Sequence, residues 1–142
     1  LGHDASALSR ANELRAQLEG LRSAHAGAAP VRVFYQVWQS PLMTVNRAQM
    51  IGDALALCGG RNVFGELAPL VPVVSTEAVV AADPEAIFTA AWRRHTQLTA
   101  VRRGWMFTVN GDLISRQGPR IVEGVSAICA ALDTVRRERA AR

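Results

Sequence analysis

The first segment of the chain carries apolar residues at the spacing of an α-helix. Between Asp4 and His25 they recur at steps of three and four, as Ala7, Ala11, Leu14, Leu18 and Leu21. This period predicts an amphipathic helix of about 22 residues, roughly 33 Å long, which Asp4 caps and which Gly27 and Pro30 end. The leucine stripe is longer than a small sheet needs. The helix is therefore either an ordinary packing helix or a strut that contacts another domain.

The following segments alternate between strand and helix patterns. Residues 31–37 predict a strand, because apolar side chains occupy its alternate positions. An unusually apolar loop, residues 38–43, comes next, and a helix is predicted from Thr44 or Asn46 to about Cys58. The remaining predicted elements are a long loop over 61–74, a helix from Ser75 to about Ala82, a buried strand over 86–89, a weak helix over 91–97, a strand over 105–109, a loop over 110–117 and a helix over 119–137.

Strands that alternate with helices predict a three-layer, Rossmann-like α/β fold with a mostly parallel sheet, preceded here by the long first helix. Ligands of such sheets bind beyond the carboxyl ends of the strands. The loops 38–43 and 110–117 are predicted to lie at that edge. This argument gives the place of a site and does not identify its ligand.

Composition and charge narrow the function classes. A chain of 142 residues with 49% hydrophobic residues fits one domain, and it holds no apolar run long enough to span a membrane. All 16 basic side chains are arginines, so lysine chemistry and a Walker-type phosphate loop are excluded. Ten of these arginines fall after residue 92, in short clusters such as 136–139, without an aromatic platform. We therefore expect a solvated basic surface and no nucleic-acid partner.

Candidate catalytic residues are few. The three histidines, His3, His25 and His95, do not adjoin an acidic motif, and no nucleophile elbow occurs. The glycine-rich segment follows a helix, so it does not form the dinucleotide-binding fingerprint. We expect neither an enzyme nor a bound metal or cofactor.

The two cysteines, Cys58 and Cys129, each fall near the inner face of a predicted helix. Without a Cys-x-x-Cys motif or a neighbouring histidine, a zinc site is disfavoured. Their spacing leaves two interpretations open. They are either buried free thiols, or a disulfide between two helices, which requires an oxidising compartment.

Several segments together resemble one protein family. They are, in order, Val-Phe-Tyr-Gln-Val-Trp (33–38), Pro-Leu-Met-Thr (41–44), Leu-Cys-Gly-Gly-Arg-Asn-Val-Phe (57–64), Val-Ser-Thr-Glu (74–77), Ala-Asp-Pro-Glu-Ala-Ile (82–87) and Asp-Leu-Ile-Ser-Arg-Gln-Gly-Pro-Arg (112–120). The chain is similar to the C-terminal lobe of helical-backbone periplasmic substrate-binding proteins of ABC importers, and most of all to the cobalamin-binding members.

The resemblance implies two α/β lobes joined by a rigid helix, with the ligand clamped between them. Residues 1–27 then correspond to the connecting helix or its C-terminal part, and residues 28–142 to the C-terminal lobe. The N-terminal lobe and the signal peptide are expected to be missing from this sequence. A periplasmic location and a disulfide between Cys58 and Cys129 are also implied.

The resemblance also assigns binding residues. Asp112 and Arg116 match the polar pair that contacts the corrinoid, although their spacing also suits a salt bridge within one helical turn. Met43 stands where the family often has an aromatic ring, as does Val37. Val71 stands where it can have a tryptophan. Trp38, in the same loop as Met43, either supplies the missing ring or belongs to the core.

The implied function is capture of a corrinoid for an ABC importer. Glu77 matches an acidic residue that docks on the permease, although a first-turn glutamate also suits any helix N-terminus. The alternative ligand is haem or a ferric siderophore, for which Tyr35 is the one candidate tyrosine. A function of another class is self-association through the leucine stripe of the first helix.

Overall fold

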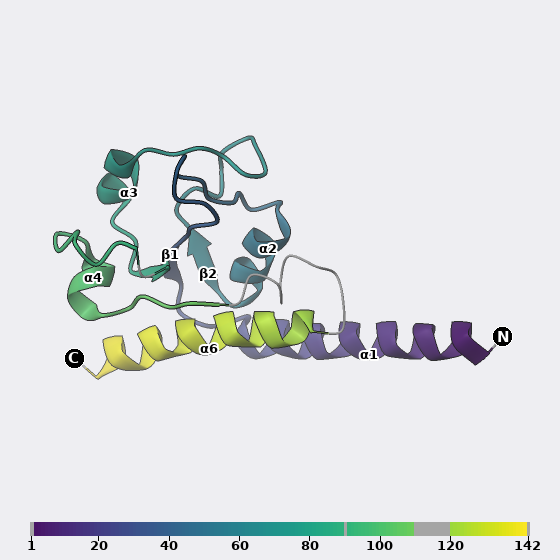
Figure 1. Cartoon of the computed structure of the whole chain (residues 1–142). Coiled ribbons are helices and arrows are strands. Elements are labelled where there is room, and N and C mark those ends of the chain that lie inside the picture. Colours follow the sequence, from purple (N-terminus) through teal and green to yellow (C-terminus); the bar gives the residue numbers. More distant parts are fainter. Residues whose placement is uncertain (1, 90, 110–119, 142) are drawn as a thin grey trace.

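The computed structural model describes residues 2–89, 91–109 and 120–141 (Figure 1). Its elements are α1 (Gly2–His25), β1 (Val31–Tyr35), α2 (Met50–Leu57), β2 (Gly60–Asn62), α3 (Thr76–Ala82), β3 (Ala86–Phe88), α4 (Thr99–Arg103) and α6 (Ile121–Ala140). In the described part of the chain, no helix combines the length and the apolar composition that crossing a membrane requires.

The sheet is parallel, with the strand order β2-β1-β3 and β1 in the centre. Val31 pairs with Gly60 on one side, and Val33 pairs with Ala86 on the other. Alternate side chains of β1 supply two cores, because successive residues of a strand face opposite ways. Val31, Val33 and Tyr35 pack with α2 and α6, whereas Phe34 packs with residues of α3 and α4. The predicted three-layer fold with a parallel sheet is confirmed.

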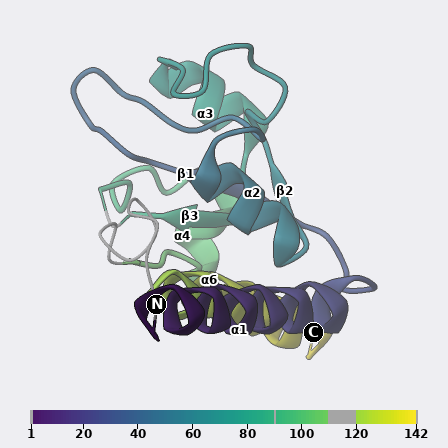
Figure 2. The ribbon, with the colours of Figure 1, turned by 90° about the vertical axis from the view of Figure 1, so that its right-hand side faces the viewer.

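The long first helix is confirmed as well, and α1 and α6 lie side by side in both ribbon views (Figures 1 and 2). Five residues of the predicted stripe are half-buried, namely Ala11, Leu14, Leu18, Leu21 and His25. The stripe does not extend to Ala7, which is exposed with its neighbours up to residue 10. The prediction that Asp4 caps the helix is wrong, because α1 already begins at Gly2.

Two predicted helices differ in position from the observed ones. The helix predicted from Thr44 or Asn46 begins only at Met50, where the Gln49 side chain caps it. The weak helix predicted over 91–97 is a series of turns, and α4 follows it at Thr99. Asp83 determines where α4 begins, since its carboxylate accepts from the Thr99 amide at 2.8 Å and from the Thr99 hydroxyl at 2.7 Å.

The strands also depart from their predictions. Strand β2 extends into residues predicted as a loop, since that loop is predicted to begin at residue 61. Residues 105–109 contribute only a single bridge, between Met106 and Ile87. Strand β3 is confirmed, and so is the cap of α3, where the Ser75 hydroxyl accepts from the Ala78 amide at 3.0 Å. The predicted loop 110–117 lies outside the described residues.

The arginines near the C-terminus are not all free in solvent, in contrast to the prediction. The side chain of Arg136 is 13% exposed. It donates to the carbonyl oxygens of Ala29 at 2.7 Å and Cys58 at 2.8 Å, and to Asp133 at 2.8 Å. These contacts fasten α6 to the segments that follow α1 and α2.

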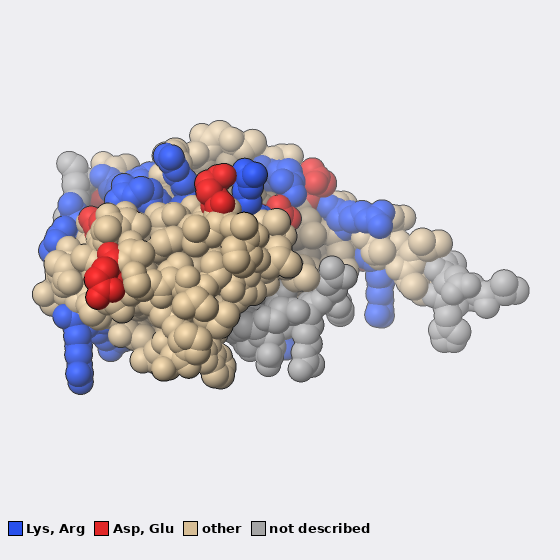
Figure 3. All heavy atoms as spheres, turned by 90° about the horizontal axis from the view of Figure 1, so that it is seen from above, with Lys and Arg blue, Asp and Glu red and all other residues tan. Residues whose placement is uncertain are grey.

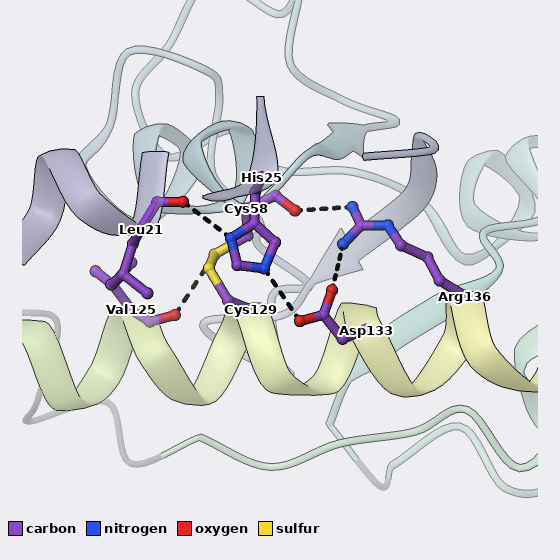
Figure 4. The surroundings of a disulfide bond; sticks show 7 residues. All are labelled: Leu21, His25, Cys58, Val125, Cys129, Asp133 and Arg136. Carbon is purple, nitrogen blue, oxygen red and sulfur yellow. Dashed lines mark hydrogen bonds and ion pairs between the residues drawn. A yellow bond between two sulfur atoms is a disulfide. The ribbon is translucent and has the colours of Figure 1, made fainter. Parts of the chain in front are cut away.

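A disulfide joins Cys58, directly after α2, to Cys129 in α6 (Figure 4). Both cysteines are buried, at 0% and 2% exposed. The pairing implied by the family resemblance is therefore present. It connects the helices that cover one face of the sheet.

His25 ties α1 to the same cluster (Figure 4). Its Nδ1 lies 2.9 Å from the Leu21 carbonyl oxygen and its Nε2 lies 3.0 Å from an Asp133 carboxylate oxygen. Both partners accept, so both ring nitrogens donate when the imidazole is protonated. The Leu21 carbonyl and Asp133 raise the pKa of His25 above its ordinary value. Burial opposes ionisation of Asp133, but hydrogen bonds from His25 and Arg136 lower the pKa of this carboxyl overall.

The disulfide is expected to contribute strongly to stability. Its cysteines are 71 residues apart, and closing a loop of that length in the unfolded chain corresponds to about 4 kcal/mol in the chain-entropy model. The variant Cys58→Ala/Cys129→Ala should lose about this much free energy of unfolding in urea titrations. Wild type in reductant serves as the control and should approach the variant. A loss below about 1 kcal/mol would show that the bond constrains little.

The His25 contact should make stability depend on pH. A raised pKa means that the folded state holds the proton more tightly. The stabilisation is therefore complete below the ordinary value of 6.5 and is lost as the pH rises through the native pKa. His25→Gln should cost more stability at pH 5.5 than at pH 9 in urea unfolding. In an Asp133→Asn background this difference should shrink, and an equal cost at both pH values would contradict the assignment.

Candidate functional site

The loops that follow β1 and β2 pair with one another in an antiparallel ribbon. Met43 is its centre, since it bridges Trp38 on one side and Val73 on the other. The Met43 amide donates to the Trp38 carbonyl oxygen at 3.0 Å. The amide of Val74 donates to the carbonyl oxygen of Leu42, also at 3.0 Å. We call residues 37–38, 42–46 and 71–74 the ribbon. Its position after two parallel strands is the edge at which such sheets bind ligands.

Two buried polar side chains fix the ribbon, one to the end of β1 and the other to the loop after β2. Thr44 is 0% exposed and its hydroxyl donates to the Tyr35 carbonyl oxygen at 2.7 Å. Asn46 is 5% exposed, and its amide nitrogen donates to the carbonyl oxygens of Leu67 at 3.0 Å and Ala68 at 3.3 Å. Among the described residues, every buried side-chain nitrogen or oxygen has a partner. The ribbon is thus fixed by satisfied internal hydrogen bonds.

Neighbouring residues complete this support. The Asn62 side chain, at the end of β2, donates to the Val45 carbonyl oxygen at 2.8 Å. Gly52 lets α2 approach closely, because a Cβ there would lie 1.9 Å from the Asn46 carbonyl oxygen. Sequence reasoning missed the role of Asn46 and interpreted it as a helix cap. Its carboxamide oxygen does accept from the amides of Ala48 and Gln49, but ahead of the helix.

The outer surface of the ribbon is apolar. Trp38 is 61% exposed, Val73 63% and Val71 38%, while Met43 is half-buried. Residues 36–46 and 67–74 contain no charged side chain. The view from above shows a broad uncharged face, with many of the arginines and acidic residues towards its rim (Figure 3). Exposed apolar surface of this kind typically marks a binding site.

The structure brings together part of the predicted site. Trp38 and Met43 are direct neighbours, and Val71 lies on the same ribbon. Trp38 does not belong to the core, and its indole nitrogen donates to the Ser40 carbonyl oxygen at 3.0 Å. Asp112 and Arg116 lie outside the described residues, so their position relative to the ribbon stays a prediction.

Two further predicted residues lie elsewhere. Glu77 is exposed in the first turn of α3, which begins soon after the ribbon ends. Tyr35, the candidate for haem or siderophore binding, is 6% exposed and stacks on Phe88 with ring centroids 5.5 Å apart. Burial raises the pKa of its phenol. Tyr35 is therefore a core residue in this chain.

The ribbon offers apolar side chains on its surface and no charged group. Within the described ranges, no three His, Cys, Asp or Glu side chains gather where they could hold a metal ion. A separate hollow lies between α1, α2 and α6, where Leu18, Met50 and Leu57 are among its lining residues. It is formed by helices and not by the loops at the carboxyl edge of the sheet, so it does not coincide with the predicted site.

Comparison with known proteins finds relatives about 30% identical, which this chain matches over about half of their length. No family model matches the chain. The vitamin B12-binding protein of Vibrio cholerae is 30% identical over 137 residues, which are 90% of this chain and 50% of that protein. The vitamin B12-binding protein of Vibrio parahaemolyticus is 31% identical over 140 residues, 91% of this chain and 50% of that protein. The chain thus spans about half the length of the curated relatives it matches.

Solved structures agree with this likeness. The crystal structure of the periplasmic vitamin B12-binding protein of Vibrio cholerae superimposes with a TM-score of 0.82 at 30% identity, covering 89% of this chain and 53% of that one. A periplasmic haem-binding protein from Roseiflexus has a TM-score of 0.75 at 16% identity, covering 89% and 55%, and shows the shared fold alone. The chain is therefore similar to the vitamin B12-binding proteins over about half of their length, and it has the fold of a periplasmic binding-protein lobe.

Proposed function

We propose that this chain is the C-terminal lobe of a periplasmic substrate-binding protein that captures a corrinoid for an ABC importer. The observation that carries the proposal is the exposed apolar ribbon of Trp38, Met43 and Val71 at the carboxyl edge of the sheet. It occurs in a homologue of proteins named for binding vitamin B12. The ribbon supplies one wall of the ligand cleft.

The wall selects its ligand by shape and apolar contact. Small-molecule sites are mostly apolar, with a few polar groups that fix orientation. Asp112 and Arg116 are the polar groups that we assign to this role, on the resemblance alone. Asp112 accepts hydrogen bonds from amide or hydroxyl donors of the ligand, and Arg116 donates to its acceptors. No bond of the ligand is made or broken, so the chain acts as a binding protein and not as an enzyme.

We divide the chain into a connecting helix and a lobe, and the burial pattern along α1 supports this division. Residues 1–27 form the connecting helix and residues 28–142 form the lobe. The C-terminal half of α1 is half-buried along one stripe, whereas residues 6–10 are exposed, and Figure 1 shows this end extending beyond the rest of the molecule. His25 and the disulfide cluster fasten the helix to the lobe. The disulfide itself suits an oxidising compartment such as the periplasm.

Glu77 is the proposed docking residue for the permease. It is exposed and lies in the first turn of α3. A carboxylate in this position can meet an arginine of a partner without first breaking an ion pair, since none with Glu77 occurs in the described part of the chain. The Ser75 hydroxyl already caps the helix, so Glu77 is not needed for capping.

Haem or a ferric siderophore is the second candidate ligand. The fold is shared with a haem-binding protein and with a structure of a Fe3+-hydroxamate transport system, which has a TM-score of 0.75 at 18% identity. The buried position of Tyr35 disfavours this alternative, because this residue is 6% exposed and its ring packs on Phe88 in the core. Self-association through α1 remains a prediction from its sequence.

Ligand capture is tested by titrating the full-length product of the gene with cyanocobalamin and following its absorbance. We expect saturable binding that Trp38→Ala weakens about tenfold, since a contacted tryptophan ring is commonly a dominant contributor to binding. Leu67→Ala is the matched control, because Leu67 is exposed and apolar but lies outside the ribbon. Tight binding of haem without any binding of cyanocobalamin would reverse the order of the two ligands.

Docking is tested with the charge reversal Glu77→Arg. Binding of the full-length product to a detergent-solubilised vitamin B12 permease should weaken at least about tenfold, because like charges then face one another. Glu123→Arg is the control, since Glu123 is also exposed in the first turn of a helix, α6, and is not assigned to docking. Equal losses in both variants, or no loss in either, would remove Glu77 from the interface.

A further inference from the structure

We propose that Val73 is a further ligand-contacting residue that determines specificity, and that Val73, Met43 and Trp38 form one flat apolar row for the uncharged face of a broad ring system. This inference rests on the proposed function and extends it to the class of ligand. Nothing in the sequence pattern singles out Val73. Its assignment comes from the pairing of segments that are 30 residues apart.

The pairing places the three side chains in line. Met43 bridges Trp38 and Val73 in antiparallel fashion, one on each side. Residues directly opposite one another in such pairs carry their side chains on the same face. Exposure supports this assignment, because Val73 is 63% and Trp38 is 61% exposed. Pro72, which alternates with Val73, is buried instead.

The width of the row indicates the size of its ligand. Paired strands lie roughly 4.8 Å apart, so three adjacent segments span about 10 Å from the first to the third. A single six-membered ring would contact only one or two of the three side chains. A flat ring system that touches all of them must be of macrocyclic breadth.

The charges around the row indicate the chemistry of that face. The row and the residues that flank it, 36–46 and 67–74, contain no charged residue, although charged residues make up 20% of the chain. An anionic group laid on this row would lose hydration without gaining a partner, which is costly. The complementary surface is therefore uncharged and apolar.

The row is also fixed before the ligand arrives. Thr44 and Asn46 hold its central segment through buried hydrogen bonds to Tyr35, Leu67 and Ala68. Binding to a surface that is already ordered avoids the entropy cost of ordering loops. A broad, flat and rigid row therefore favours a flat, rigid ligand over a flexible open-chain chelator.

The experiment places one carboxylate on the row. Val73→Asp and the matched control Leu70→Asp are made in the full-length product of the gene and titrated with cyanocobalamin by calorimetry. Leu70 is 56% exposed just before the last segment of the ribbon, and it takes no part in the bridge that pairs Val73 with Met43. We expect Val73→Asp to weaken binding at least about tenfold, and Leu70→Asp to change it less than twofold. Thermal melts confirm that both variants are folded.

The outcomes separate this inference from the proposed function. If Trp38→Ala weakens binding but Val73→Asp does not, the ribbon is still the ligand-binding surface, but the assignment of Val73 to the row is wrong. If Val73→Asp and Leu70→Asp weaken binding equally, added charge alone explains the loss and the row is also wrong. If Val73→Asp impairs only permease binding, Val73 belongs to the docking surface instead. If wild type binds neither cyanocobalamin nor haem, both the proposed function and the row are overturned.

Discussion

The hydrogen bonds of two buried side chains, Thr44 and Asn46, are the constraint on which the candidate site depends. An apolar loop in water would ordinarily turn its side chains inward, because burial of apolar surface is favourable. Here the backbone is held by Thr44 to the end of β1 and by Asn46 to the loop after β2. The side chains of Trp38 and Val73 consequently stay outside. A polar scaffold thus maintains an apolar surface.

A second rigid cluster holds the opposite side of the lobe. The disulfide joins α2 to α6, His25 joins α1 to Asp133 of α6, and Arg136 joins α6 to the carbonyl of Cys58 (Figure 4). Removing one member leaves a buried or charged partner without its contact, so the three links support one another. This matters for the role proposed for α1 as a connecting helix, because a lobe moves as a rigid body only when the helix cannot slide over it.

The sequence pattern predicted those elements that are stabilised by residues close to one another in the chain. The alternation in β1, the helical stripe of α1 and the Ser75 cap all appear in the sequence as short-range signals. Strand β2 has three residues and no period of its own, and it exists because it pairs with β1. The start of α4 is determined by Asp83, 16 residues earlier. The contacts of Arg136 are also non-local, since its carbonyl partners lie 78 and 107 residues away in the sequence.

The residues of the candidate site also differ in whether a local sequence pattern could predict them. Trp38 and Met43 could be found from the apolar composition of one loop, whereas Val73 needs the register between two loops, which only the fold supplies. By the family resemblance, Met43, Val37 and Val71 stand at positions that can hold aromatic rings, and their side chains offer less flat area. Each lost ring removes apolar contact that contributes on the order of 1 kcal/mol or more. The wall is therefore shallower than an aromatic one, and the alignment of its side chains matters more for recognition than the size of any one of them.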